Sequence, residues 1–235
     1  MFKLALDAGH GIKTAKGCIK SLDPNETREW TLNARIAEKV EAKLKDYTGY
    51  ELLRTDDRTG AKDVAVKTRT DFANRWGADF FLSIHHNGGV KGGKGGGIVA
   101  YVYTKVGEET KAWQKALYDN LIRHTGLRGN RSTPLNSANF HVCRETKMPA
   151  VLLELGFMDS STDVPIILTE TYAEQCADAI VEVLVQRGGL KRKPKENTGK
   201  IYRVQVGAYS ERKYAEAQLK ELKAAGFTEA YIREG

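Results

Sequence analysis

Short apolar runs alternate with helical patterns through the first 187 residues, and this alternation constrains the fold more than any other feature of the chain. Runs typical of strands occupy residues 2–7, 50–54, 79–86, 97–103 and 150–157. Helical spacing of apolar side chains fills the segments between them, at residues 29–44, 64–76, 113–121 and 172–185. Strands that alternate with helices predict an α/β fold with a largely parallel sheet.

The helix expected over residues 64–76 has candidate boundary residues at both ends. Asp63 carries a side-chain oxygen that can cap the first turn, and Gly77 is typical of the position just after a helix. Val66 and Phe72 contribute to its apolar pattern. We therefore expect a helix that begins after Asp63 and ends at Gly77.

The composition changes after residue 187. GGLKRKPKENTGK at residues 188–200 combines clustered cations with Gly and Pro and has no apolar periodicity, which predicts a linker. Residues 201–235 then show a strand pattern, a helical pattern and a second short apolar run, which together predict a small β-α-β segment. Because a segment this small buries little apolar surface, it is expected to be an appendage to a main domain at residues 1–187.

Charge and cysteine content narrow the class of protein. The formal net charge of +7 favours an anionic partner, such as nucleic acid, a membrane surface or a polyanionic cell wall. No nucleic-acid-binding motif is present, so a nucleic acid is not the expected partner. Cys18, Cys143 and Cys176 are odd in number and form no CxxC pair, so we expect free thiols rather than a disulfide framework or a cysteine zinc cluster.

The sequence gives no indication of membrane insertion or of a signal peptide. It lacks a run of about 18 apolar residues, the length that a membrane span requires. MFKLALDAGHG at the N-terminus has no long apolar stretch behind a charged region and no small-residue cleavage site. We therefore expect a protein made in the cytoplasm, which another route delivers to any substrate outside the membrane.

Three polar residues lie within the expected parallel strands or at their carboxyl ends. His10 follows the first strand and His85 closes the third, and carboxyl ends of parallel strands are where α/β folds place their ligands. Glu154 lies inside the last apolar run, where an ionised carboxylate is costly to bury without a partner. A metal or catalytic role would explain this position, and an ion pair with an arginine such as Arg144 is the structural alternative.

Zinc catalysis uses three protein ligands drawn from His and Asp or Glu, with one position left for water, and a further carboxylate takes a proton from that water. The HExxH motif is absent, so any such site is assembled from distant segments. His85 and His86 are adjacent in a strand and point to opposite faces, so at most one of them is expected to be a ligand.

Four blocks carry a resemblance to a known family: LDAGHG at 6–11, EWTLNARIA at 29–37, FLSIHHN at 81–87 and MPAVLLELGF at 148–157. In this order they resemble the zinc-dependent N-acetylmuramoyl-L-alanine amidases of type 3, a family of bacterial autolysins and phage endolysins. The resemblance implies a central, mostly parallel six-stranded sheet flanked by helices. It also implies hydrolysis of the amide that joins N-acetylmuramic acid to L-alanine of the peptidoglycan stem peptide.

The resemblance also implies roles for individual residues. The implied Zn²⁺ ligands are His10, Glu29 and His85, and the implied catalytic glutamate is Glu154. Glu26 competes with Glu29, but the block matches directly when it begins at Glu29. His86 is then expected to be a packed histidine or one that supports a ligand, and Asn87 is expected only to line the site.

Two further segments, a glycine-rich stretch and the C-terminal residues, also carry a structural prediction. GGVKGGKGGG at 88–97 lacks the order GxxxxGK[ST] and a following helix, so we expect a mobile loop beside the active cleft rather than a phosphate-binding loop. Residues 201–235, beginning YRVQVGAY at 202–209, resemble one SPOR repeat, of which complete peptidoglycan-binding modules contain two. A single repeat leaves sheet edges unpaired, which predicts a homodimer through residues 201–235.

The sequence therefore predicts a peptidoglycan hydrolase, and the lack of a recognisable signal peptide favours a phage endolysin released through the membrane. A sporulation-type autolysin released by lysis of the mother cell remains an alternative, as do a zinc peptidase acting within the stem peptide and a non-catalytic wall-binding protein. The positive charge also predicts retention on anionic wall polymers.

Overall fold

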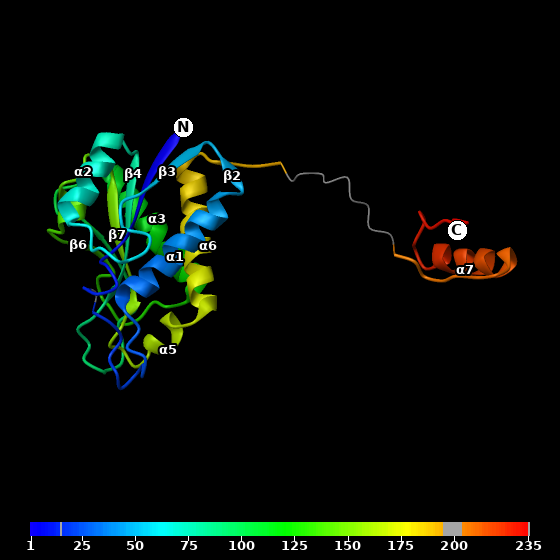
Figure 1. The fold of residues 1–235 in the computed structure, drawn as a ribbon, viewed down its shortest axis with the longest axis horizontal. Coiled ribbons are helices and arrows are strands. Elements are labelled where there is room, and N and C mark those ends of the chain that lie inside the picture. The colour runs from blue at the N-terminus through cyan, green and yellow to red at the C-terminus, as the bar shows by residue number, and fades with distance from the viewer. Residues whose placement is uncertain (15, 195–203, 235) are drawn as a thin grey trace. The chain divides into compact units, whose positions relative to one another are not determined.

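The computed structural model describes residues 1–14, 16–194 and 204–234 (Figure 1). They form two compact units, Met1–Lys193 and Pro194–Gly235. The first unit extends beyond residue 187, because helix α6 ends at Gly188 and the strand β8 (Lys191–Arg192) pairs antiparallel with β2 (Tyr47–Thr48). Residues 188–193 of the expected linker thus fall within this unit, and its residues 195–200 lie outside the described residues.

A six-stranded sheet forms the centre of the first unit. Its strands in spatial order are β3 (Tyr50–Arg54), β1 (Phe2–Ala8), β4 (Phe80–Asn87), β7 (Ala150–Phe157), β5 (Ile98–Val102) and β6 (Leu135–Ser137). Neighbouring strands are parallel except for β7 and β5, which run antiparallel. The predicted α/β fold with a mostly parallel six-stranded sheet is confirmed.

Helices cover both faces of this sheet (Figure 1). One face carries α1 (Glu29–Leu44), α3 (Glu108–Thr125) and α6 (Glu170–Gly188), and the other carries α2 (Val66–Trp76) and the short α4 (His141–Arg144). The remaining helix of this unit, α5 (Val164–Ile167), follows β7. None of the helices in the described residues is both long and apolar enough to cross a bilayer.

Strand alternation divides the buried side chains between the two faces. Leu82 and Leu153 belong to the larger core, with apolar residues of α1, α3 and α6. Phe81 and Leu152 belong to a smaller core, which includes Ala73 of α2. Because α2 and α4 are shorter than the helices opposite, less of the sheet is covered on their face.

The start of α2 differs from the prediction. The helix begins at Val66 without a side-chain cap, and the carboxylate of Asp63 accepts hydrogen bonds from Thr14 and Arg69 instead. The buried guanidinium of Arg69 needs acceptors, and Asp63 is one of them. The helix ends as expected at Gly77, which has a left-handed φ of 69°.

In the C-terminal unit the predicted helix is confirmed as α7 (Arg212–Ala224). The strands expected on either side of it are not formed in the described residues, and residues 201–203 of the first of them lie outside that range. A strand is stable only when its backbone groups are paired and one face is covered. Neither condition is met here, and Val204, Val206 and Phe227 are 87%, 62% and 62% exposed.

Candidate metal centre

The strand register brings the sequence-predicted site residues to one edge of the sheet. Ala8 of β1 lies opposite Ile84 of β4, so His10 and His85 follow at the carboxyl ends of neighbouring strands. His85 in turn lies directly opposite Glu154 of β7. The carboxyl ends of parallel strands thus gather these side chains, as the pattern of the sequence predicts.

Glu29 joins this group as the first residue of α1. Its Oε2 lies 3.3 Å from Nε2 of His10, and its Oε1 lies 2.9 Å from Nδ1 of His85. One donor atom from each of the three residues lies within 4.8 Å of the other two. Within the described part of the chain this is the one such group of His, Cys, Asp and Glu, and Glu26 does not belong to it.

The donor set suits a divalent metal ion. Tetrahedral zinc has bonds of about 2.0–2.2 Å to nitrogen and oxygen, which places its ligand atoms about 3.5 Å apart. The observed distances among His10, Glu29 and His85 are close to this value, and small side-chain rotations make up the difference. Burial acts to raise the pKa of Glu29, but hydrogen bonds with both histidines hold it far below its usual value, so the carboxylate is ionised. The site therefore offers two imidazoles and one carboxylate anion.

The backbone that carries His10 is held in place by a buried arginine. His10 has a left-handed φ of 68°, which is unusual for a residue with a side chain. Arg69 of α2, only 2% exposed, donates to the carbonyl oxygens of His10 at 3.0 Å and Ala8 at 2.8 Å. It also donates to the buried carboxylate of Asp7, at 2.7 Å. The sequence analysis missed Arg69, which resembles an ordinary polar residue of an amphipathic helix.

Gly9 allows the two histidines to approach each other. A Cβ atom at this position would lie 2.0 Å from Cε1 of His85, well inside van der Waals contact. The rings of His10 and His85 meet edge to face with centroids 4.9 Å apart. A glycine at position 9 is therefore a steric requirement of the group.

Glu154 lies beside the His10–Glu29–His85 group rather than in it. Its Oε2 is buried and has no hydrogen-bond partner in the described structure. Burial raises the pKa of Glu154 to about 7, with His85 acting to lower it and Glu29 acting to raise it. The ion pair with Arg144 considered as an alternative is not formed, because Arg144 binds Glu145 and Asn139. A carboxyl group that titrates near neutral pH is suited to accepting and returning a proton.

His86 points to the opposite face of β4, as strand alternation predicts. It is 2% exposed, and its Nδ1 lies 2.8 Å from Oδ1 of Asn33. Burial lowers the pKa of His86 to about 3, so the ring is neutral and donates its Nδ1 proton to Asn33. Asn33 then donates from Nδ2 to the Gly9 carbonyl and to Oε1 of Glu29. The sequence analysis missed Asn33, although a polar residue four positions after Glu29 among buried ones was a usable signal.

The glycine-rich segment at residues 88–97 is a loop, as predicted, and leads directly into β5. The N–H groups of Gly89 and Lys91 donate to Oδ2 of Asp159 at 2.8 and 2.7 Å. The N–H of Gly97 donates to Oδ2 of Asp163 at 2.7 Å. The loop is thus tied at both ends to the segment that follows β7, and its N–H groups serve that contact rather than a phosphate.

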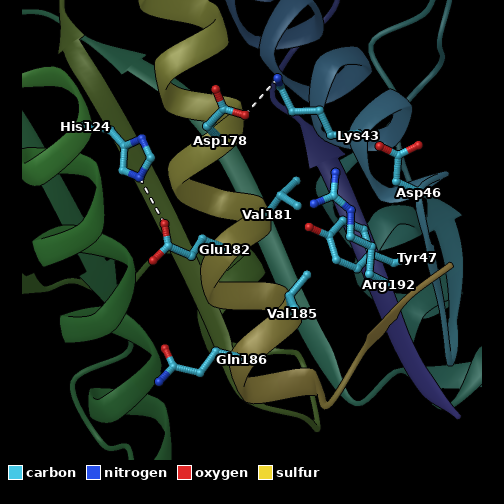
Figure 2. Close-up of a pocket in the computed structure, with 10 residues that line it drawn as sticks. All are labelled: Lys43, Asp46, Tyr47, His124, Asp178, Val181, Glu182, Val185, Gln186 and Arg192. Carbon is cyan, nitrogen blue, oxygen red and sulfur yellow. Dashed lines mark hydrogen bonds and ion pairs between the residues drawn. The ribbon is translucent and has the colours of Figure 1, made fainter. Parts of the chain in front are cut away.

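A separate cavity lies away from this group of residues (Figure 2). It has a volume of about 710 Å³ and is lined by residues of α1, α3, α6, β2 and β8. Two of its charged pairs are already matched: Lys43 with Asp178 at 2.8 Å and His124 with Glu182 at 3.1 Å. None of the four predicted site residues lines it, so this cavity is separate from the candidate site at the sheet edge.

Comparisons with known proteins identify the family of the chain. The sequence profile of the N-acetylmuramoyl-L-alanine amidase family matches residues 4–186, and that of the SPOR domain matches residues 174–234. The first match covers all four predicted site residues. The second begins within α6 of the first unit and continues through α7.

Individual relatives support the same family assignment. A sporulation-specific N-acetylmuramoyl-L-alanine amidase of Bacillus subtilis is 35% identical over 230 residues, which is 97% of this chain and 83% of that protein. An endolysin of Bacillus phage SPP1 is 30% identical over 188 residues, 80% of this chain and 66% of that one. The catalytic domain of the amidase CwlV from Bacillus (Paenibacillus) polymyxa var. colistinus superimposes with a TM-score of 0.70 at 29% identity, covering 81% of this chain and 100% of that domain. The chain therefore belongs to the N-acetylmuramoyl-L-alanine amidase family, whose members hydrolyse peptidoglycan, and carries a SPOR domain at its C-terminal end.

Proposed function

We propose that the protein cleaves the amide between N-acetylmuramic acid and L-alanine of the stem peptide, with a zinc ion held by His10, Glu29 and His85. The observation that carries this proposal is the direct pairing of His85 with Glu154 across β4 and β7. It sets a carboxyl group with an unpartnered oxygen beside a His–Glu–His group. This is the arrangement that metal-assisted hydrolysis requires.

Each residue has a separate task in this reaction. A bound zinc ion supplies a Lewis acid that activates water and polarises a carbonyl group. Glu154 takes the proton from the attacking water on its carboxylate and passes it to the nitrogen of the departing L-alanine. Arg69 and Asn33 keep His10 and Glu29 in position through the hydrogen bonds described above.

The variant Glu154→Gln tests this assignment. It keeps the shape of the side chain but cannot accept a proton as a carboxylate does. We expect it to retain about one zinc per chain while the release of L-alanine amino groups from purified wall falls by about 10²-fold or more. An unchanged release rate would contradict the role of Glu154. A new amino group on a residue other than L-alanine would support a stem-peptide peptidase instead.

We further propose that the enzyme acts as a sporulation-type autolysin. The similarity to the sporulation-specific amidase extends over 230 residues at 35% identity, whereas that to the phage endolysin extends over 188 residues at 30%. This supports the role of a sporulation-type autolysin over that of a phage endolysin, which was the role expected from the sequence. In either role the enzyme would reach the wall after release from the cell that makes it. Deleting the gene in a sporulating host should delay mother-cell lysis, and unchanged lysis would contradict the proposal.

We propose that the C-terminal unit holds the enzyme on peptidoglycan and pairs with a second copy of itself. Its exposed Val206 and Phe227 are apolar groups that pairing would cover. Net positive charge would add retention on anionic wall polymers, which should weaken in about 0.5 M salt.

Sedimentation of the full chain tests this role of the C-terminal unit. Wild type should be a dimer at micromolar concentration, and Phe227→Lys should be a monomer with weaker wall binding. Val66→Lys, which changes an exposed apolar residue of α2, serves as the control. A monomeric wild type would contradict the pairing.

A further inference from the structure

A second, smaller cavity lies at the same edge of the sheet as Glu154. It has a volume of about 220 Å³. Its lining includes Asn87 at the end of β4, Val99 and Tyr101 of β5, Asn136 of β6 and Arg131 from the segment that precedes β6. None of the proposed zinc ligands lines this cavity, and neither does Glu154.

The strand register places the cavity next to the proposed catalytic carboxyl group. Val99 lies directly opposite Glu154, and paired residues of neighbouring strands point to the same face of a sheet. Asn136 lies opposite Tyr101, one strand further along. Because neighbouring strands are about 4.8 Å apart, the cavity begins roughly one strand spacing from Glu154.

The cavity carries a positive charge that is not matched by an anion. The guanidinium of Arg131 lies over the ring of Phe157, 4.5 Å from its centroid. Among the described residues Arg131 forms no ion pair with a carboxylate, and no carboxylate lines the cavity. This contrasts with the larger cavity, where acidic and basic groups are paired with each other.

Two side-chain amides also line the cavity. The side-chain oxygen of Asn87 accepts from the N–H of Gly88, and that of Asn136 accepts from the N–H of Ser137, both at 2.8 Å. These bonds fix both amides so that their NH₂ groups remain as donors, and no acceptor for either lies among the described residues. A site with a guanidinium and two amide donors is complementary to an anion with several acceptor oxygens.

The order of the strands also indicates which part of the substrate reaches the cavity. The metal-binding side chains lie on the β1 and β4 side of Glu154, whereas Arg131 and Asn136 lie on its β5 and β6 side. Glu154 passes its proton to the leaving amine, so the peptide part of the substrate lies on the Glu154 side of the reacting carbon. Continuing in that direction, the peptide enters the cavity.

We propose that this cavity binds a carboxylate of the stem peptide and that Arg131 is the residue that selects it. This proposal rests on the proposed amidase function and adds to it a preference for an acidic peptide. Bidentate pairing with the guanidinium would fix the position of the peptide, and the amides of Asn87 and Asn136 would complete the carboxylate's hydrogen bonds.

Two synthetic muramoyl-L-alanyl peptides test the proposal with the zinc-loaded full chain. They differ in one group only: the residue after L-alanine carries a free carboxylate in one and a carboxamide in the other. Wild type should favour the acid in kcat/KM by about 10-fold or more, mainly through KM, which is the size expected of a charge-assisted bidentate bond. Arg131→Gln should bring this ratio close to one, and Arg131→Lys should leave an intermediate ratio.

Arg75→Gln is the matched control, because Arg75 also lies over an aromatic ring, that of Phe72, but on α2. It should keep the preference of the wild type. Cleavage of both peptides without preference, or a ratio that Arg131→Gln leaves unchanged, would overturn the carboxylate site alone. A zinc-loaded wild type that cleaves neither peptide would overturn the amidase function and the carboxylate site with it.

Discussion

His85 and Glu154 lie directly opposite each other on β4 and β7, so an imidazole of the His10–Glu29–His85 group and a buried carboxyl group share one face of the sheet. The pairing is set by strand register, which the surrounding core fixes through Leu82 and Leu153 on the other face. A slip of one residue in either strand would move one of the two groups to the opposite face. The geometry of the candidate site and the packing of the core are therefore determined by the same register.

The two adjacent histidines are predicted to respond differently to substitution. His85→Ala removes a metal-binding side chain, so zinc content should fall to near zero. His86→Ala removes the buried partner of Asn33, which should lower the free energy of unfolding by about 1–3 kcal/mol while zinc content stays near one per chain. Metal analysis and denaturant unfolding of the two purified variants check this. Loss of zinc in both would contradict the division of roles.

Glu154 is predicted to make the metal-free protein less stable as pH rises. Its pKa of about 7 in the folded chain lies above the ordinary value of 4.5, so between these values the folded state binds more protons than the unfolded state. The free energy of unfolding therefore falls from pH 4.5 to 7. The Glu154→Gln variant cannot ionise at this position, so it lacks this pH effect. With a chelator present, the Tm of this variant should exceed that of wild type by more at pH 8 than at pH 5.

The exposed Glu108→Gln serves as the control for this pH measurement, because its carboxylate is on the surface of α3. It should show no such difference between the two pH values. A gain for Glu154→Gln that is equal at pH 5 and pH 8 would contradict the raised pKa of Glu154.

Arg69 is predicted to be the most costly arginine to remove. Arg69→Met leaves the carboxylate of Asp7 buried without its cation, which should lower the free energy of unfolding by about 3–5 kcal/mol. Arg58→Met, which breaks an exposed pair with Glu41, should cost about 1 kcal/mol or less. Urea unfolding of both variants measures these two costs. Similar decreases in the free energy of unfolding would show that burial adds little to the stabilisation from the Arg69–Asp7 ion pair.

Gly9→Ala is predicted to prevent metal binding without unfolding the protein. The added Cβ would overlap the His85 ring, which must then turn away from Glu29. Gly107→Ala is the matched control, because a Cβ there meets nothing within 4 Å and its φ of −76° suits alanine. Zinc titration should show that Gly9→Ala lowers the affinity for zinc by 10-fold or more, as expected when a ligand is displaced. Gly107→Ala should bind zinc like wild type. Equal affinities would contradict the steric requirement.

The sequence predicted most of the sheet and the site, for physical reasons that particular residues show. Long apolar runs such as 150–157 predicted buried strands correctly, and alternation separated His85 from His86. The three-residue β6 has too few buried side chains to give a pattern, so its presence followed only from the family resemblance. The supporting residues Arg69 and Asn33 were missed, because their partners come from segments distant in the chain.

The C-terminal unit shows where local pattern is insufficient. Alternation in residues 204–209 predicted a strand, but a strand also needs a neighbour to receive its hydrogen bonds, and the described residues of this unit supply none. The helix α7 formed as predicted, because its hydrogen bonds are internal.

End-group analysis of purified peptidoglycan, digested by the full chain before and after removal of its metal, tests the proposed zinc amidase activity most directly. We expect about one zinc per chain and release of the L-alanine amino group without new reducing sugar ends. A chelator should abolish this release, and added zinc should restore it. Release that continues in the metal-free enzyme, or new ends at another bond, would contradict a zinc amidase.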